Sequence, residues 1–151
     1  MALKAISQFP VAFGVCLAVA AVGAAHAAPA DLPELLRSIP LNLEGRHVDG
    51  ERQVEVWGTL YDGTRFEAHY TPRGVDDIEV RGHHATLPLA LVDRFVPGAA
   101  RTYPQLSHIT RLTQIDRSET GQVEVEGWTI DGRAVKAEFD RAGRLIGFEN
   151  D

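Results

Sequence analysis

The chain has 151 residues, of which 44% are hydrophobic and 24% charged, and its formal net charge is −6. Its basic residues are scattered among Asp and Glu, which argues against a nucleic-acid partner, because binding phosphates requires a positive face.

The first 27 residues have the pattern of a secretory signal peptide. Lys4 supplies a positive start, residues 11–24 are apolar, and Ala25-His26-Ala27 gives the small-x-small pattern of a cleavage site. The alternative is an uncleaved membrane anchor, but the apolar run is short for a span of roughly 20 residues. We therefore expect a periplasmic or secreted protein that does not contact the membrane after cleavage. The only cysteine, Cys16, lies in this segment, so the mature chain would contain no disulfide.

A short helix is predicted next, over residues 31–39. Asp31 is a candidate N-cap, Glu34 follows three residues later, and four apolar side chains then have helical spacing: Leu32, Leu35, Leu36 and Ile39.

Residues 54–74 and 123–143 form an internal repeat, with eight identities in 21 positions at a constant offset of 69. Each copy contains a Val-Glu-Val alternation, an Asp-Gly turn (Asp62-Gly63 and Asp131-Gly132) and a second alternating segment, which together predict a β-hairpin. Third strands are predicted at residues 78–80 and 145–148, and another strand at residues 109–115. The alternation predicts a shared core face: Val54, Val56, Phe66, Ala68 and Tyr70 with Val123, Val125, Val135, Ala137 and Phe139.

A second helix is predicted between the copies. Thr86 is its candidate cap, Leu87, Leu91 and Phe95 have helical spacing, and Pro97-Gly98 ends it. The predicted fold is therefore α+β: two tandem helix-plus-antiparallel-sheet repeats, with the helices packed on one face of the sheet.

The second copy resembles a PepSY-type module. The resemblance rests on "VPGA" at residues 96–99, the Asp-Gly turn and "AEFDRAGRLI" at residues 137–146. It covers residues 85–151, and residues 30–80 more loosely, because Tyr70-Thr71-Pro72 replaces the Phe-Asp of the motif. Together with the signal peptide (1–27), it divides the chain into a divergent first repeat (28–84) and a second repeat (85–151).

This resemblance also implies a function. PepSY-like modules are exported bacterial domains without catalytic residues, and they are implied to bind or inhibit proteins such as peptidases. The tandem layout is also similar to that of secreted β-lactamase inhibitor proteins, which grip the enzyme with a sheet face.

The strand alternation places large apolar side chains on the face opposite the core, where polar residues are expected. We predict that these residues bind a protein partner, with acidic residues around them: Trp57, Tyr61, Trp128 and Ile130. Cross-strand packing, or contact between repeats or between protomers, would also explain them. A bulge at Gly58 or Gly127 would instead turn either Trp inward.

No metal, cofactor or catalytic site is predicted. His83 and His84, if they lie in a strand, would point to opposite faces, and the other histidines have no ligand spacing. None of the serines at positions 38, 107 and 118 lies in a Gly-x-Ser-x-Gly elbow.

The sequence therefore indicates an exported, non-enzymatic protein-binding module, and the more specific expectation is an inhibitor or regulator of a secreted or envelope hydrolase such as a peptidase. The alternatives are a small-ligand or metal-binding periplasmic carrier and a self-associating envelope structural protein.

Overall fold

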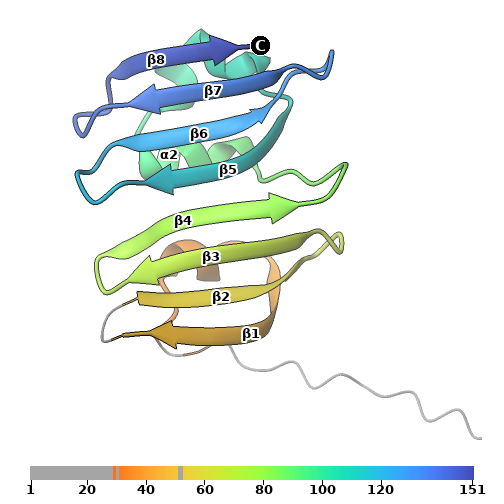
Figure 1. Ribbon diagram of the computed structural model, residues 1–151, viewed down its shortest axis with the longest axis vertical. Helices are drawn as coiled ribbons and strands as arrows, with labels where there is room; N and C mark the ends of the chain where they lie inside the picture. The colour runs from red at the N-terminus through yellow and green to blue at the C-terminus, as the bar shows by residue number, and fades with distance from the viewer. Residues whose placement is uncertain (1–28, 30, 51–52) are drawn as a thin grey trace, which may run out of the picture.

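The computed structural model describes residues 29, 31–50 and 53–151, which form one antiparallel sheet with short helical segments behind it (Figure 1). The predicted signal peptide at residues 1–27 lies outside the described residues. The sheet has eight strands that pair in sequence order. Their bounds are β1 (Leu41–Asp49), β2 (Gln53–Leu60), β3 (Arg65–Thr71), β4 (Gly74–Arg81), β5 (Arg111–Arg117), β6 (Val123–Trp128), β7 (Ala134–Phe139) and β8 (Leu145–Asn150).

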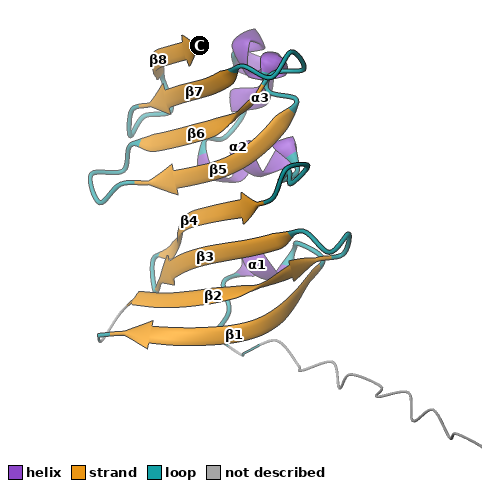
Figure 2. Cartoon of the chain, turned by 45° about the vertical axis from the view of Figure 1, so that its right-hand side comes forward, coloured by secondary structure: helices purple, strands orange, loops and turns teal. Residues whose placement is uncertain are grey.

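The helical segments are short, and all lie on one side of the sheet (Figure 2). Segment α1 rests against β4 and α2 against β5. The bounds of the segments are α1 (Glu34–Arg37), η1 (Leu89–Leu91), α2 (Val92–Phe95), α3 (Ala99–Thr102) and η2 (Pro104–His108), where η denotes a 3₁₀-helix.

The predicted α+β architecture of two helix-on-sheet repeats is wrong. The eight-stranded sheet dominates the structure, and no α-helix in the described part of the chain exceeds four residues. Prolines explain the short helices: Pro33 and Pro40 bracket α1, and Pro97 follows α2, so neither apolar pattern can extend into a longer helix.

Neither predicted helix cap is used. Asp31 instead accepts a hydrogen bond from the guanidinium of Arg46 at 3.0 Å, and α1 begins after Pro33 with no side-chain cap. Thr86 Oγ1 accepts a hydrogen bond from the backbone N–H of Leu112 at 3.2 Å. Both side chains tie the connecting segments to the sheet.

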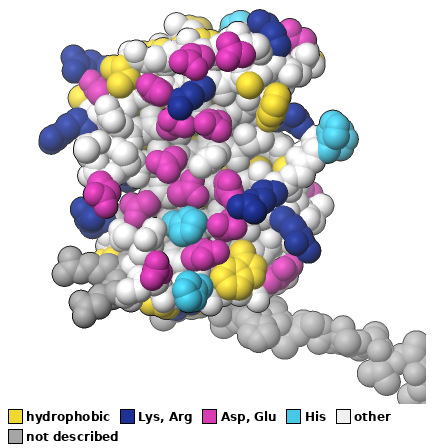
Figure 3. Space-filling model, viewed as in Figure 1, with side chains coloured by type: hydrophobic (Ala, Val, Ile, Leu, Met, Phe, Trp, Pro, Cys, Tyr) yellow, Lys and Arg dark blue, Asp and Glu magenta, His cyan; other side chains and the backbone are white. Residues whose placement is uncertain are grey.

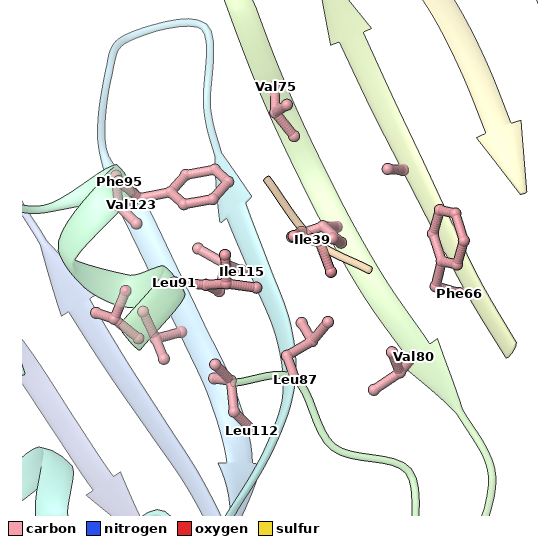
Figure 4. Close-up of a cluster of buried hydrophobic side chains, with 14 of the residues drawn as sticks. Ile39, Phe66, Val75, Val80, Leu87, Leu91, Phe95, Leu112, Ile115 and Val123 are labelled. Atoms are coloured by element: carbon pink, nitrogen blue, oxygen red, sulfur yellow. The ribbon is translucent and has the colours of Figure 1, made fainter. Parts of the chain in front are cut away.

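The core lies between the helical segments and one face of the sheet, as the close-up in Figure 4 shows for part of it. The core face predicted from strand alternation is confirmed, because all ten residues are buried. Side chains from η1, α2 and the connection before them complete this layer, among them Leu87, Leu91 and Phe95. The opposite face of the sheet is open.

Strands β1–β4 and β5–β8 follow the same path with matching irregularities. Val54 pairs with Tyr70, and Val123 with Phe139, 69 positions later. The β1–β2 pairing slips between Leu43 and Gly45, and the β5–β6 pairing slips between Leu112 and Gln114, again 69 positions later. Pairing of β4 with β5 joins the two halves into one continuous sheet. The proposed boundary between residues 84 and 85 falls in the connection between these strands.

Candidate functional site

The open face of the sheet carries two rows of mostly acidic side chains that cross the strands (Figure 3). Each row consists of directly paired residues on successive strands. The first row contains His47, Glu55, His69, Asp77, Asp116, Glu124 and Glu138, and the second contains Trp57, Glu67, Glu79, Gln114, Glu126 and Lys136. We call these two rows, without Trp57, the acidic face.

Several neighbours within the acidic face carry the same charge. Glu67 pairs with Glu79, Asp77 with Asp116, and Asp116 with Glu124. Like charges directly opposite each other destabilise a sheet. A positively charged partner would relieve this repulsion.

Two basic side chains offset part of this charge. Lys136 Nζ lies 2.7 Å from Glu124 Oε2 and 3.5 Å from Glu138 Oε1. Arg81 Nη2 lies 2.5 Å from Glu79 Oε1 and 3.4 Å from Glu67 Oε2.

The pKa values on this face reflect the crowding. Burial raises the pKa of Asp77, although hydrogen bonds from Gln114 and His69 oppose this effect. Burial also raises the pKa of Asp116, and the nearby charge of Glu124 adds to it. Burial acts on Glu124 as well, but the hydrogen bonds with Lys136 and Glu126 and the positive charge of Lys136 together outweigh it and lower the pKa of that carboxyl. The middle of the face is therefore a place where negative charge is costly.

Trp57 and Trp128 lie on the open side of the sheet, as predicted, and each is 38% exposed. Trp57 covers Gly45 of β1, where a Cβ atom would lie 2.1 Å from the indole ring. The guanidinium carbon of Arg111 lies 5.6 Å from the ring centre of Trp128, within range of a cation–π contact. The bulges lie on β1 and β5, opposite Gly58 and Gly127, and leave both indoles facing outward.

Tyr61 and Ile130 lie in turns rather than on a strand face. Each follows the strand that carries one of the tryptophans, at positions 69 apart, and they are 83% and 91% exposed. The Asp-Gly turns are confirmed: Gly63 and Gly132 have φ values of 83° and 80°, which a residue without a Cβ adopts readily.

The four predicted contact residues form two separate pairs at the same end of the sheet. Strands β2 and β6 run in the same direction (Figure 1). Trp57 with Tyr61, and Trp128 with Ile130, therefore lie toward the C-terminal ends of these two strands, on the same side of the molecule. Four strand spacings of about 4.8 Å separate the tryptophans, or roughly 19 Å. The acidic face lies beside and between the two pairs.

The sequence did not reveal the contribution of β4 and β5. Asp77, Gln114 and Asp116 come together only because these two strands pair, and they line a depression in the open face. The exposed apolar side chains of Val48 and Ile146, 52% and 55% exposed, were also missed. Alternation within β4 was the one signal that could have placed Asp77 on this face.

His83 and His84 do not lie in a strand, which is what the expectation that they point to opposite faces assumed. They follow the end of β4 in a turn, and their ring centres lie 4.7 Å apart. Because they are outside a strand, the rule that neighbouring side chains alternate does not apply to them.

Comparisons with known proteins add little. No protein-family model and no curated protein matches the chain, so the PepSY resemblance stays a prediction. Among solved structures, the chain is similar to one from Bacteroides vulgatus described as a candidate periplasmic protein of unknown function. The TM-score is 0.44 at 17% identity, and the match covers 78% of this chain and 91% of that one. None of the helices in the described residues is long and apolar enough to cross a membrane.

Proposed function

We propose that this chain is an exported, non-enzymatic protein-binding module that holds a basic partner protein against the open face of its sheet. The observation that supports this proposal most is the juxtaposition of exposed aromatic side chains with the acidic face. Trp57 and Trp128 supply apolar anchors, and rows of carboxylates lie beside them. Buried Trp side chains are common hot spots in protein interfaces, and charge complementarity speeds association and sets specificity.

The dimensions of the face suit such a partner. Eight strands at a spacing of about 4.8 Å give a surface about 34 Å wide. A standard interface buries about 800 Å² on each partner, which this surface can provide. A partner that covers both tryptophans would span the middle of the acidic face and neutralise its paired carboxylates.

The open face would recognise a protein with a positively charged surface that has recesses for two indole rings. A secreted or envelope hydrolase such as a peptidase is the target that the PepSY resemblance implies.

The test is affinity capture from the envelope extract of the native host, followed by measurement of the dissociation constant for the purified partner. Truncating an anchor costs about 2 kcal/mol or more, so Trp57→Ala/Trp128→Ala should weaken binding by roughly 30-fold or more. Raising the salt concentration should slow association, because it screens the acidic face.

Val48→Ala is the matched control, because it also removes an exposed apolar side chain, but Val48 pairs with the core residue Val54 and so lies on the side of the sheet opposite the tryptophans. It should leave the dissociation constant unchanged. Equal binding by the wild type and the double variant would move the interface away from this face.

A further inference from the structure

Three side chains at the β1–β4 end of the acidic face converge on one point. Glu55 of β2 pairs directly with His69 of β3, and Glu67 lies two residues before His69 on the same face. One ligand atom from each lies within 4.8 Å of those of the other two, and all three side chains are half-buried. Imidazole nitrogen and carboxylate oxygen are both ligands that Zn²⁺ accepts.

The imidazole of His69 is oriented by a further carboxylate. Its Nδ1 lies 3.4 Å from Asp77 Oδ2, and its Nε2 lies 4.0 Å from Glu67 Oε1. Asp77 is fixed in turn, because Gln114 Nε2 donates a hydrogen bond to its Oδ1 at 3.1 Å. A carboxylate that holds one histidine nitrogen while the other turns to a ligand is the usual second layer of a zinc site.

The second half of the chain has a different set of side chains at the equivalent positions. The residues 69 positions later are Glu124, Lys136 and Glu138, on β6 and β7. The ammonium group of Lys136 lies within 3.5 Å of both carboxylates. In the first half, Glu67 stands in the position of Lys136. The second-half triad therefore contains a positive charge, whereas the first-half triad contains two carboxylates and an imidazole.

The neighbouring cation does not take over this role. Arg81 contacts Glu67 through Oε2, whereas Oε1 is the atom closer to His69. The Arg81 side chain is 69% exposed and binds Glu79 as well. Within residues 29, 31–50 and 53–151, the carboxylate of Glu55 has no hydrogen bond or ion pair.

We propose that Glu55, Glu67 and His69 bind one divalent transition-metal ion of the Zn²⁺ class, with Asp77 orienting His69. The mixed donor set of one nitrogen and two carboxylates favours Zn²⁺ over Mg²⁺ and Ca²⁺, which take oxygen ligands. Water completes the coordination on the open side. The site lies within the acidic face, where Glu67 pairs directly with Trp57, but metal binding does not require the proposed partner.

The experiment is isothermal titration of the purified chain, prepared without a polyhistidine tag and freed of metal, with ZnCl₂ and separately with MgCl₂. We expect one Zn²⁺ per chain and no comparable uptake of Mg²⁺. Asp77→Asn should weaken Zn²⁺ binding by about 10- to 100-fold, as loss of an orienting partner typically does. His69→Ala and Glu67→Lys should weaken it further, the latter because it rebuilds the lysine-filled triad of the second half.

Glu55→Gln and Glu124→Gln form the matched pair, because they change the same residue type at equivalent positions. The first should weaken Zn²⁺ binding and the second should not. Circular dichroism melts establish that each variant is folded. The proposal is overturned if the wild type takes up no Zn²⁺, if His69→Ala binds as the wild type does, or if His83→Ala/His84→Ala removes the binding instead.

Discussion

Asp77 is a carboxyl group placed where its charge is poorly solvated. Its side chain is 15% exposed and faces Asp116 across the β4–β5 pairing. Burial raises its pKa above 3.8, and the hydrogen bonds from Gln114 and His69 compensate only in part. A position on the sheet selected only for stability would carry a neutral side chain here, which fits a role for this carboxylate in binding.

The pH dependence of stability should report this charge. An acid whose pKa is raised by folding binds its proton more tightly in the folded chain, so its contribution to stability falls as the pH rises through the folded pKa. Asp77→Asn removes this loss. We expect the variant to gain melting temperature over the wild type at about pH 7 but not at about pH 3, where Asp77 is protonated.

Thermal melts of both proteins across this range, in the presence of a metal chelator, measure the effect. A difference in melting temperature that stays constant with pH would show that ionised Asp77 is not destabilising.

Gly127 is required by a close approach of two strands rather than by its φ angle. A Cβ atom there would lie 2.3 Å from the carbonyl oxygen of Arg111 and 2.6 Å from Ile109 Cγ2. Gly127→Ala should destabilise the chain by about 1–3 kcal/mol, the usual cost of overpacking, as measured by urea denaturation. Gly147→Ala is the control, because its new Cβ would meet only the movable side chain of Glu138, at 3.2 Å. Similar losses in both would contradict this explanation.

At the scale of the elements, the hairpins could be predicted because their signals are local. An Asp-Gly turn with alternating residues on either side specifies both strands and their register. The predicted helices were too long, because apolar spacing alone does not show that the prolines at positions 33, 40 and 97 limit helix length. Strand β1 was missed because its alternation is interrupted at Gly45, where the pairing with β2 slips.

For the candidate site as well, only the features that depend on local sequence patterns could be predicted. Alternation along β2 and β6 was enough to place Trp57 and Trp128 on the open side. The contacts of His69 with Asp77, and of Asp77 with Gln114, require knowledge of which strands pair. The pairing of β4 with β5 joins segments that are separated by a connection of 29 residues, at positions 82–110, and no local pattern in the sequence specifies it.

The turn between β6 and β7 is stabilised by a buried threonine. Thr129 Oγ1 accepts a hydrogen bond from the backbone N–H of Arg133 at 3.0 Å and donates one to Asp131 Oδ1 at 2.5 Å. Thr129→Val keeps the shape but removes both bonds, so we expect a loss of about 1–3 kcal/mol in unfolding free energy. Thr59→Val, on strand β2, is a suitable control, because the Thr59 hydroxyl makes no hydrogen bond within the described residues. A wild-type melting curve for Thr129→Val would rule this contribution out.

At the scale of the whole molecule, one core and one sheet should unfold together. Ile78 and Ile115 pair across the junction between β4 and β5, and both are fully buried. Ile115→Ala should therefore lower the unfolding free energy by about 2–5 kcal/mol while keeping a single transition. Calorimetry and far-ultraviolet circular dichroism would measure this, and two separate transitions would show that the halves unfold independently.

The pairing of every strand with its neighbours in sequence has a consequence for how the chain acquires its shape. No strand has to wait for a distant part of the chain before it finds a partner, and most of the closing turns are short. Low contact order of this kind favours rapid folding. A polypeptide that emerges with its N-terminus first could add one hairpin after another, with β1 and β2 serving as the template before β8 has appeared.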